Sequence, residues 1–134
     1  MNVLWTVVLF FYRTNLFAAE PTILTLDIVV QIEDEPLSRP TLSINSGDTA
    51  SIESLSKDGE GFVIEVTPTL QNTNQVQMSF IVTKINKDTR TILSSPQIIT
   101  LLDQSATITQ KHADSSEPSL SLSVTPSLQK ENSL

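Results

Sequence analysis

Hydrophobic and polar residues alternate along most of the chain after Pro21. In the stretch TILTLDIVVQIE, residues 22–33, every second residue from Leu24 onward is aliphatic, and most residues between them are polar. A period of two is typical of a β-strand that buries one face. The same alternation recurs in residues 62–68, 76–85 and 119–126. These runs predict strands.

Turn-forming residues separate the alternating runs. Clusters rich in Asn, Asp, Gly and Ser occupy residues 45–48, 57–61, 72–74, 86–88 and 113–118. No stretch after residue 20 has apolar residues at the 3.6-residue spacing of a helix. About eight short strands, each with one apolar face, predict an all-β fold, either a small β-sandwich or a small barrel.

Two parts of the sequence are repeated in the same order. LSRPTLSINSGDTASI, residues 37–52, matches LSSPQIITLLDQSATI, residues 93–108, at Leu-Ser-x-Pro and at Ala-x-Ile. Further along, Val-Thr-Pro-x-Leu-Gln occurs at residues 66–71 and again at residues 124–129. Matches of this kind indicate a tandem duplication.

Each copy is predicted to be a four-stranded unit: a long strand, a strand led by proline, a return strand and a strand that ends in Val-Thr-Pro. One unit alone would leave its apolar face in water, whereas two can bury their faces against each other. The predicted organisation is a leader at residues 1–19, repeat units at 20–71 and 72–129, and a polar tail at 130–134. Residues 20–129 then form one compact domain.

The predicted core sets apolar residues of the first unit against those of the second. Leu42, Ile44, Ala50, Ile52, Phe62, Ile64 and Val66 are expected to face Ile98, Ala106, Ile108, Leu120, Leu122 and Val124. Prolines are expected at the ends of strands, where a missing N–H does not break a ladder. Pro40 and Pro96 would begin strands, and Pro68 and Pro126 would end them.

The N-terminus has the pattern of a signal peptide. An apolar run from Val3 to Tyr12 is too short to span a bilayer as a helix but has the length of a signal-peptide core. Ala18 and Ala19 precede Glu20 and form a small-residue cleavage site. Export is therefore expected. A misassigned start codon and a short retained anchor stay open, because no Lys or Arg precedes the apolar run.

Charge and cysteine content exclude several classes of function. The net charge of −7 and the pI near 4.5 argue against binding of nucleic acid or of an anionic membrane surface, which need clustered Lys and Arg. The chain has no cysteine, which removes disulfides, thiolate metal ligands and cysteine nucleophiles.

Few residues are candidates for catalysis or metal binding. His112 is the only histidine and lies in a polar loop. The acidic run of residues 33–35 is contiguous, whereas calcium prefers alternating oxygen ligands around a glycine-containing loop. Ser43, Ser51 and Ser54 have no adjacent base. These observations predict no catalytic residue, no metal site and no cofactor.

TRTILSSPQIITLLDQSATI, residues 89–108, resembles part of the core domain of secretins. These proteins form ring-shaped outer-membrane channels in type II and type III secretion and in type IV pili. The shared elements are Leu-Ser-x-Pro, an apolar strand, a turn and Ala-x-Ile, and residues 37–82 resemble a longer part of the same domain. The ring-building domains and an amphipathic transmembrane hairpin are not visible in this sequence. The resemblance implies a β-module in the periplasm or at the outer membrane, as an accessory to a secretion or pilus machine.

The leading interpretation is a non-enzymatic, exported interaction module that binds a protein partner in the cell envelope. The long strand 22–33 is expected at a sheet edge, where it could add to a partner's sheet. Its candidate contact residues are Leu24, Leu26, Ile28, Val29, Val30 and Ile32. No membrane-spanning helix is expected after removal of the leader, and homo-oligomerisation stays open.

Two alternatives remain. The first is a truncated secretin-like outer-membrane component. The second is a small hydrolase or carbohydrate-binding β-domain, which as a hydrolase would need carboxylates that converge in a cleft. The strand faces offer only Asp27, Glu53 and Glu65 for that role, and these are isolated along the sequence.

Overall fold

The computed structural model describes residues 4–9, 22–32, 37–111 and 119–129. The described residues form ten β-strands and contain no helix, so none of them lies in a helix that could cross a membrane. The all-β prediction is confirmed. The strands are β1 (Leu4–Leu9), β2 (Ile23–Ile32), β3 (Thr41–Asn45), β4 (Ala50–Leu55), β5 (Glu60–Gln71), β6 (Gln75–Asn86), β7 (Thr89–Ser94), β8 (Gln97–Leu101), β9 (Ala106–Gln110) and β10 (Leu120–Leu128).

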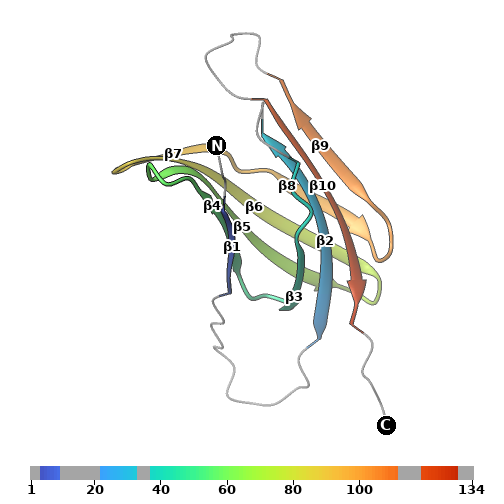
Figure 1. The fold of residues 1–134 in the computed structure, drawn as a ribbon. Coiled ribbons are helices and arrows are strands. Elements are labelled where there is room, and N and C mark those ends of the chain that lie inside the picture. Colours follow the sequence, from blue (N-terminus) through green and yellow to red (C-terminus); the bar gives the residue numbers. More distant parts are fainter. Residues whose placement is uncertain (1–3, 10–21, 33–36, 112–118, 130–134) are drawn as a thin grey trace.

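The strands form two antiparallel sheets that pack face to face as a sandwich (Figure 1). The larger sheet has the order β1-β4-β5-β6, and β7 and β8 share the remaining edge of β6. The smaller sheet has the order β3-β2-β10-β9. Of the two predicted architectures, the structure is the sandwich.

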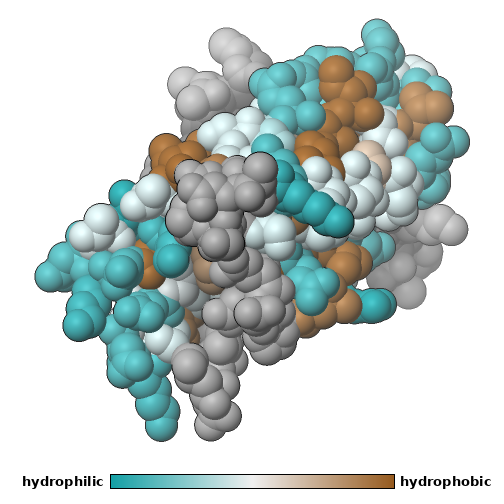
Figure 2. Space-filling model, turned by 90° about the horizontal axis from the view of Figure 1, so that it is seen from above, coloured by the Kyte–Doolittle hydropathy of each residue, from teal (hydrophilic) through white to brown (hydrophobic). Residues whose placement is uncertain are grey.

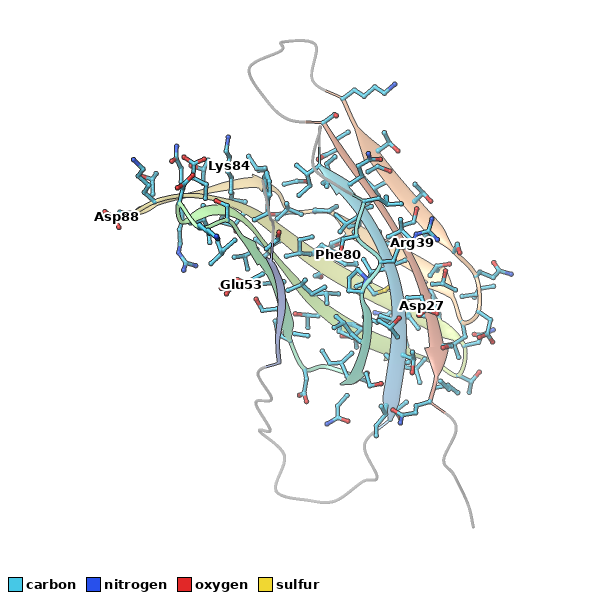
Figure 3. The ribbon with its side chains drawn as sticks, in the orientation of Figure 1. Asp27, Arg39, Glu53, Phe80, Lys84 and Asp88 are labelled. Carbon is cyan, nitrogen blue, oxygen red and sulfur yellow. The ribbon has the colours of Figure 1, made fainter. Side chains whose placement is uncertain are left out.

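The inward faces of both sheets make one hydrophobic core, as the alternation predicts. Phe80 on β6 is its largest fully buried side chain and lies between the sheets in Figure 3. All the residues of the predicted core belong to it, but Phe62, Ala106 and Ile108 are only partly buried. The fully buried side chains include Leu24, Leu26, Ile28, Val30, Leu42, Ile44, Ile52, Ile64, Val66, Met78 and Leu122.

The two repeat units lie side by side, and each contributes strands to both sheets. The smaller sheet takes β2 and β3 from the first unit and β9 and β10 from the second, and the larger sheet takes β4 and β5 from the first and β6, β7 and β8 from the second. The expectation that one unit packs its face against the other is therefore wrong. The chain crosses between sheets in the middle of each unit, since β3 and β4 lie in different sheets, as do β8 and β9.

Equivalent positions of the two units make equivalent hydrogen bonds. The N–H of Ile28 donates to the carbonyl oxygen of Pro40 over 3.0 Å, and the N–H of Phe80 donates to that of Pro96 over 2.9 Å. The Thr49 and Thr67 hydroxyls also share a hydrogen bond, and their counterparts Ser105 and Thr125 share another. The strand order and these bonds relate the two halves by an approximate twofold symmetry.

Pro68 and Pro126 lie inside β5 and β10, and their expected place at strand ends is wrong. Both are tolerated there because the neighbouring strands, β4 and β9, stop at the pairs with Val66 and Val124. The carbonyl oxygen of each proline accepts a hydrogen bond over 2.7 Å, Pro68 from Gly47 and Pro126 from Asp103.

Gly47 and Asp103 occupy the same place in their two turns. Both have positive φ, 92° for Gly47 and 66° for Asp103. Aspartate is one of the few residues besides glycine that tolerates this conformation. The two turns therefore keep the same backbone conformation although one has glycine and the other aspartate at this position.

Candidate functional site

The predicted contact strand, β2, is an interior strand and not an edge. It pairs with β3 on one side and with β10 on the other. Its predicted contact residues are Leu24, Leu26, Ile28, Val30 and Ile32, which are buried, and Val29, which is partly buried. Because both sets of backbone groups are already paired, strand addition at β2 is excluded in this fold.

Among the described residues, no strand pairs with the outer edge of β9. This strand ends the order of the smaller sheet, pairs with β10 on its inner side, and lies at one border of the sandwich in Figure 1. An unpaired strand edge is a template for another strand. This edge can therefore accept an extended segment of another chain.

The hydrogen-bond alternation identifies which backbone groups of β9 point outward. The N–H of Gln129 donates to Ile23, so odd-numbered residues of β10 bond to β2 and even-numbered ones bond to β9. Even-numbered β9 residues therefore face β10 across the pair Ile108–Leu122. Thr107 and Thr109 direct their N–H and C=O groups to the open edge.

The equivalent edge in the larger sheet is occupied. β4 is the counterpart of β9, since Ala50 and Ile52 match Ala106 and Ile108 in sequence and in pairing. Strand β1 pairs antiparallel along the whole outer edge of β4, from Leu4–Leu55 to Leu9–Ala50. The smaller sheet has no such strand among the described residues.

Side chains at equivalent positions of β4 and β9 differ in exposure, and those on β9, which lacks an outer neighbour among the described strands, are the more exposed. Ala50 and Ile52 are each 1% exposed, whereas Ala106 and Ile108 are only partly buried although they occupy the same positions. The inward apolar side chains at the rim of the smaller sheet are thus incompletely covered. An added strand would complete their burial, which is favourable.

The outer faces of the edge strands differ as well. Ile99 and Leu101 on β8 are 57% and 43% exposed, and their counterparts on β3 are Ser43 and Asn45. In the view of Figure 2, exposed apolar groups are separated by hydrophilic ones and form no continuous patch. Scattered exposed apolar side chains are ordinary on protein surfaces, so the pair on β8 does not by itself indicate a binding site.

Hydroxyl groups cover the outer face of the smaller sheet and pair with one another. Thr107 and Ser123 share a hydrogen bond of 2.7 Å across β9 and β10, and Thr41 donates to Asp27 over 3.0 Å across β3 and β2. Cross-strand pairs of this kind stabilise a sheet. These hydroxyl groups have hydrogen-bond partners within the protein, so their presence on this face does not indicate a ligand site.

The three strand carboxylates do not converge. Asp27 lies on the outer face of the smaller sheet, and Glu53 and Glu65 lie on the outer face of the larger one; Figure 3 shows Asp27 and Glu53 on opposite sides of the sandwich. Within the described part of the chain, no three His, Asp or Glu side chains are grouped to hold a metal ion. His112 and residues 33–35 lie outside the described residues.

The three serines that have no adjacent base in the sequence lie in different surroundings. Ser54 is buried, Ser51 is partly buried on β4, and Ser43 is exposed on the edge strand β3. In the nearby turn, the hydroxyl of Ser46 accepts a hydrogen bond from the N–H of Leu70 over 2.8 Å.

Sequence reasoning missed the β9 edge because residues 106–110 alternate like every other strand. The duplication shows which positions of β4 and β9 are equivalent, but their burial can be compared only once the strand pairing is known.

Comparison with known proteins finds no matching family model, no matching curated protein and no matching solved structure.

Proposed function

We propose that the protein is a non-enzymatic interaction module that binds an extended segment of another protein at the outer edge of β9. One observation carries this proposal: Ala106 and Ile108 are partly exposed, whereas the equivalent Ala50 and Ile52, on the strand that pairs with β1, are buried. A bound segment would pair with the outward groups of Thr107 and Thr109 and would bury the two apolar side chains. This is β-augmentation, in which main-chain hydrogen bonds supply affinity.

The cell envelope is the proposed location of this contact. The signal-peptide pattern of residues 1–19 supports export, and the secretin-like stretch at residues 89–108 supports a partner from a secretion or pilus machine. The net charge of −7 favours a protein partner over nucleic acid.

Proline substitutions at two edge positions test the proposal. Thr109→Pro removes an outward N–H from β9 but leaves the bonds to β10 in place, so the fold is expected to survive. Ser43→Pro is the matched control: it removes an outward N–H from β3, the opposite edge of the same sheet. With the full chain, in which β1 occupies β4, partner recovery from an envelope extract should be retained with Ser43→Pro and lost with Thr109→Pro.

Hydrogen exchange provides the second measurement. Binding of the recovered partner should slow exchange of the Thr107 and Thr109 amides and leave the Ser43 amide unchanged. Equal partner recovery by both proline variants, with no protection on β9, would reject strand addition at this edge.

A further inference from the structure

We infer that the segment Leu4–Leu9 of a second copy of this chain binds the open edge of β9. The inference rests on the proposed function, because it takes β9 to be a strand acceptor and names its occupant. It concerns the chain that carries residues 4–9. The starting observation is that this segment already pairs with β4, the strand equivalent to β9.

The two acceptor strands are alike at the positions that matter for pairing. β4 reads Ala-Ser-Ile-Glu and β9 reads Ala-Thr-Ile-Thr over the same four positions. Both ladders place the alanine opposite a valine of the neighbouring interior strand, Ala50 opposite Val66 and Ala106 opposite Val124. A segment that fits one edge therefore meets the same spacing of backbone groups and of apolar side chains at the other.

The observed register predicts the new one. Leu9 lies opposite Ala50 and Val7 lies opposite Ile52. Transferred to β9, the same segment places Leu9 opposite Ala106 and Val7 opposite Ile108. These are the two side chains that remain partly exposed.

The occupant comes from another copy because the segment of the same chain lies at the far border of the sandwich. β1 and β9 belong to different sheets and lie at opposite borders of the sandwich (Figure 1). The copy that donates its segment releases it from its own β4, so filling β9 of one copy frees β4 of the other. Reciprocal donation between two copies gives a closed dimer with twofold symmetry in which both β9 edges are filled and both β4 edges are free.

Disulfide trapping in the full chain tests the register directly. The chain has no native cysteine, so only the introduced thiols can form a disulfide. Leu9 and Ala50 form a non-hydrogen-bonded pair, because odd-numbered β4 residues bond to β1, and such pairs bring side chains close enough to bridge. We would mix a Leu9→Cys protein with a tagged Ala106→Cys protein under mild oxidation. A disulfide-linked heterodimer is expected.

Three further variants define the result. Thr109→Cys in place of Ala106→Cys moves the thiol out of register and should lower the heterodimer yield several-fold. Adding Thr109→Pro to the Ala106→Cys acceptor should abolish the crosslink. Adding Ser51→Pro to the donor weakens the hold of its own β4 on the segment and should raise the yield.

The outcomes separate this inference from the proposed function. A crosslink with no register preference, or one that survives Thr109→Pro, overturns the inference. If the inference fails in this way but binding of an envelope partner is still lost with Thr109→Pro, β9 accepts a strand and only the proposed occupant is wrong. If neither the crosslink nor partner binding depends on Thr109, both proposals fall.

Discussion

Phe80 is the residue on which the core depends most. It is 1% exposed and is the largest side chain that is fully buried between the sheets. Phe80→Ala should lower the free energy of unfolding by about 3–5 kcal/mol, because the sheets cannot close the cavity. Phe62→Ala should cost clearly less, since Phe62 is only partly buried. Urea denaturation of both variants checks the order, and an equal or larger loss for Phe62→Ala would contradict this description of the core.

The difference between these two phenylalanines could not be predicted from the sequence. Both lie on alternating runs, and alternation indicates which face a residue occupies but not how near it is to a border of the sheet. Phe80 lies on β6 opposite Val66, in the middle of the larger sheet, whereas Phe62 pairs with Ser54 near the end of β4. Burial depends here on how far the neighbouring strands extend.

At the scale of single strands, the interior position of β2 reverses the expected effect of a proline. Val29 lies opposite Ser123, and the odd-numbered residues of β2 bond to β10. Val29→Pro should therefore break the centre of the smaller sheet and cost on the order of 3 kcal/mol from the lost and unsatisfied hydrogen bonds. Thr109→Pro on the open edge should change stability by less than about 1 kcal/mol. Thermal or denaturant unfolding measures both, and a Val29→Pro protein as stable as Thr109→Pro would contradict the pairing of β2.

The alternating runs predict where most strands lie but not which strands are neighbours. The run at residues 22–33 became β2, Ile23–Ile32, and the run at 76–85 became most of β6. Pairing joins residues far apart in the sequence, such as Val124 and Ile28, and local periodicity carries no information about it. The same reason explains why the contact strand was placed at an edge and why the open edge of β9 was not predicted.

For the molecule as a whole, the main prediction is that export removes residues 1–19. If export removes them, the protein recovered from the envelope should begin near Glu20. The amides of Ser51 and Glu53, which bond to β1 in the full chain, should then exchange rapidly, and those of Thr107 and Thr109 should exchange rapidly in both forms. N-terminal sequencing and hydrogen exchange measure these two effects. Intact Met1 recovered from a cytosolic fraction would contradict export.

If β4 and β9 both accept strands, as proposed for β9, the N-terminal segment sets how many partners one chain binds. A chain that keeps residues 4–9 on β4 then has one of these two acceptor edges free, and such a unit can only terminate an assembly. A chain cut before Glu20 has both edges free, in different sheets and at opposite borders of the sandwich (Figure 1). It can join two partners in series. A single proteolytic cut would then turn a terminator into a connector while both sheets keep their remaining strands.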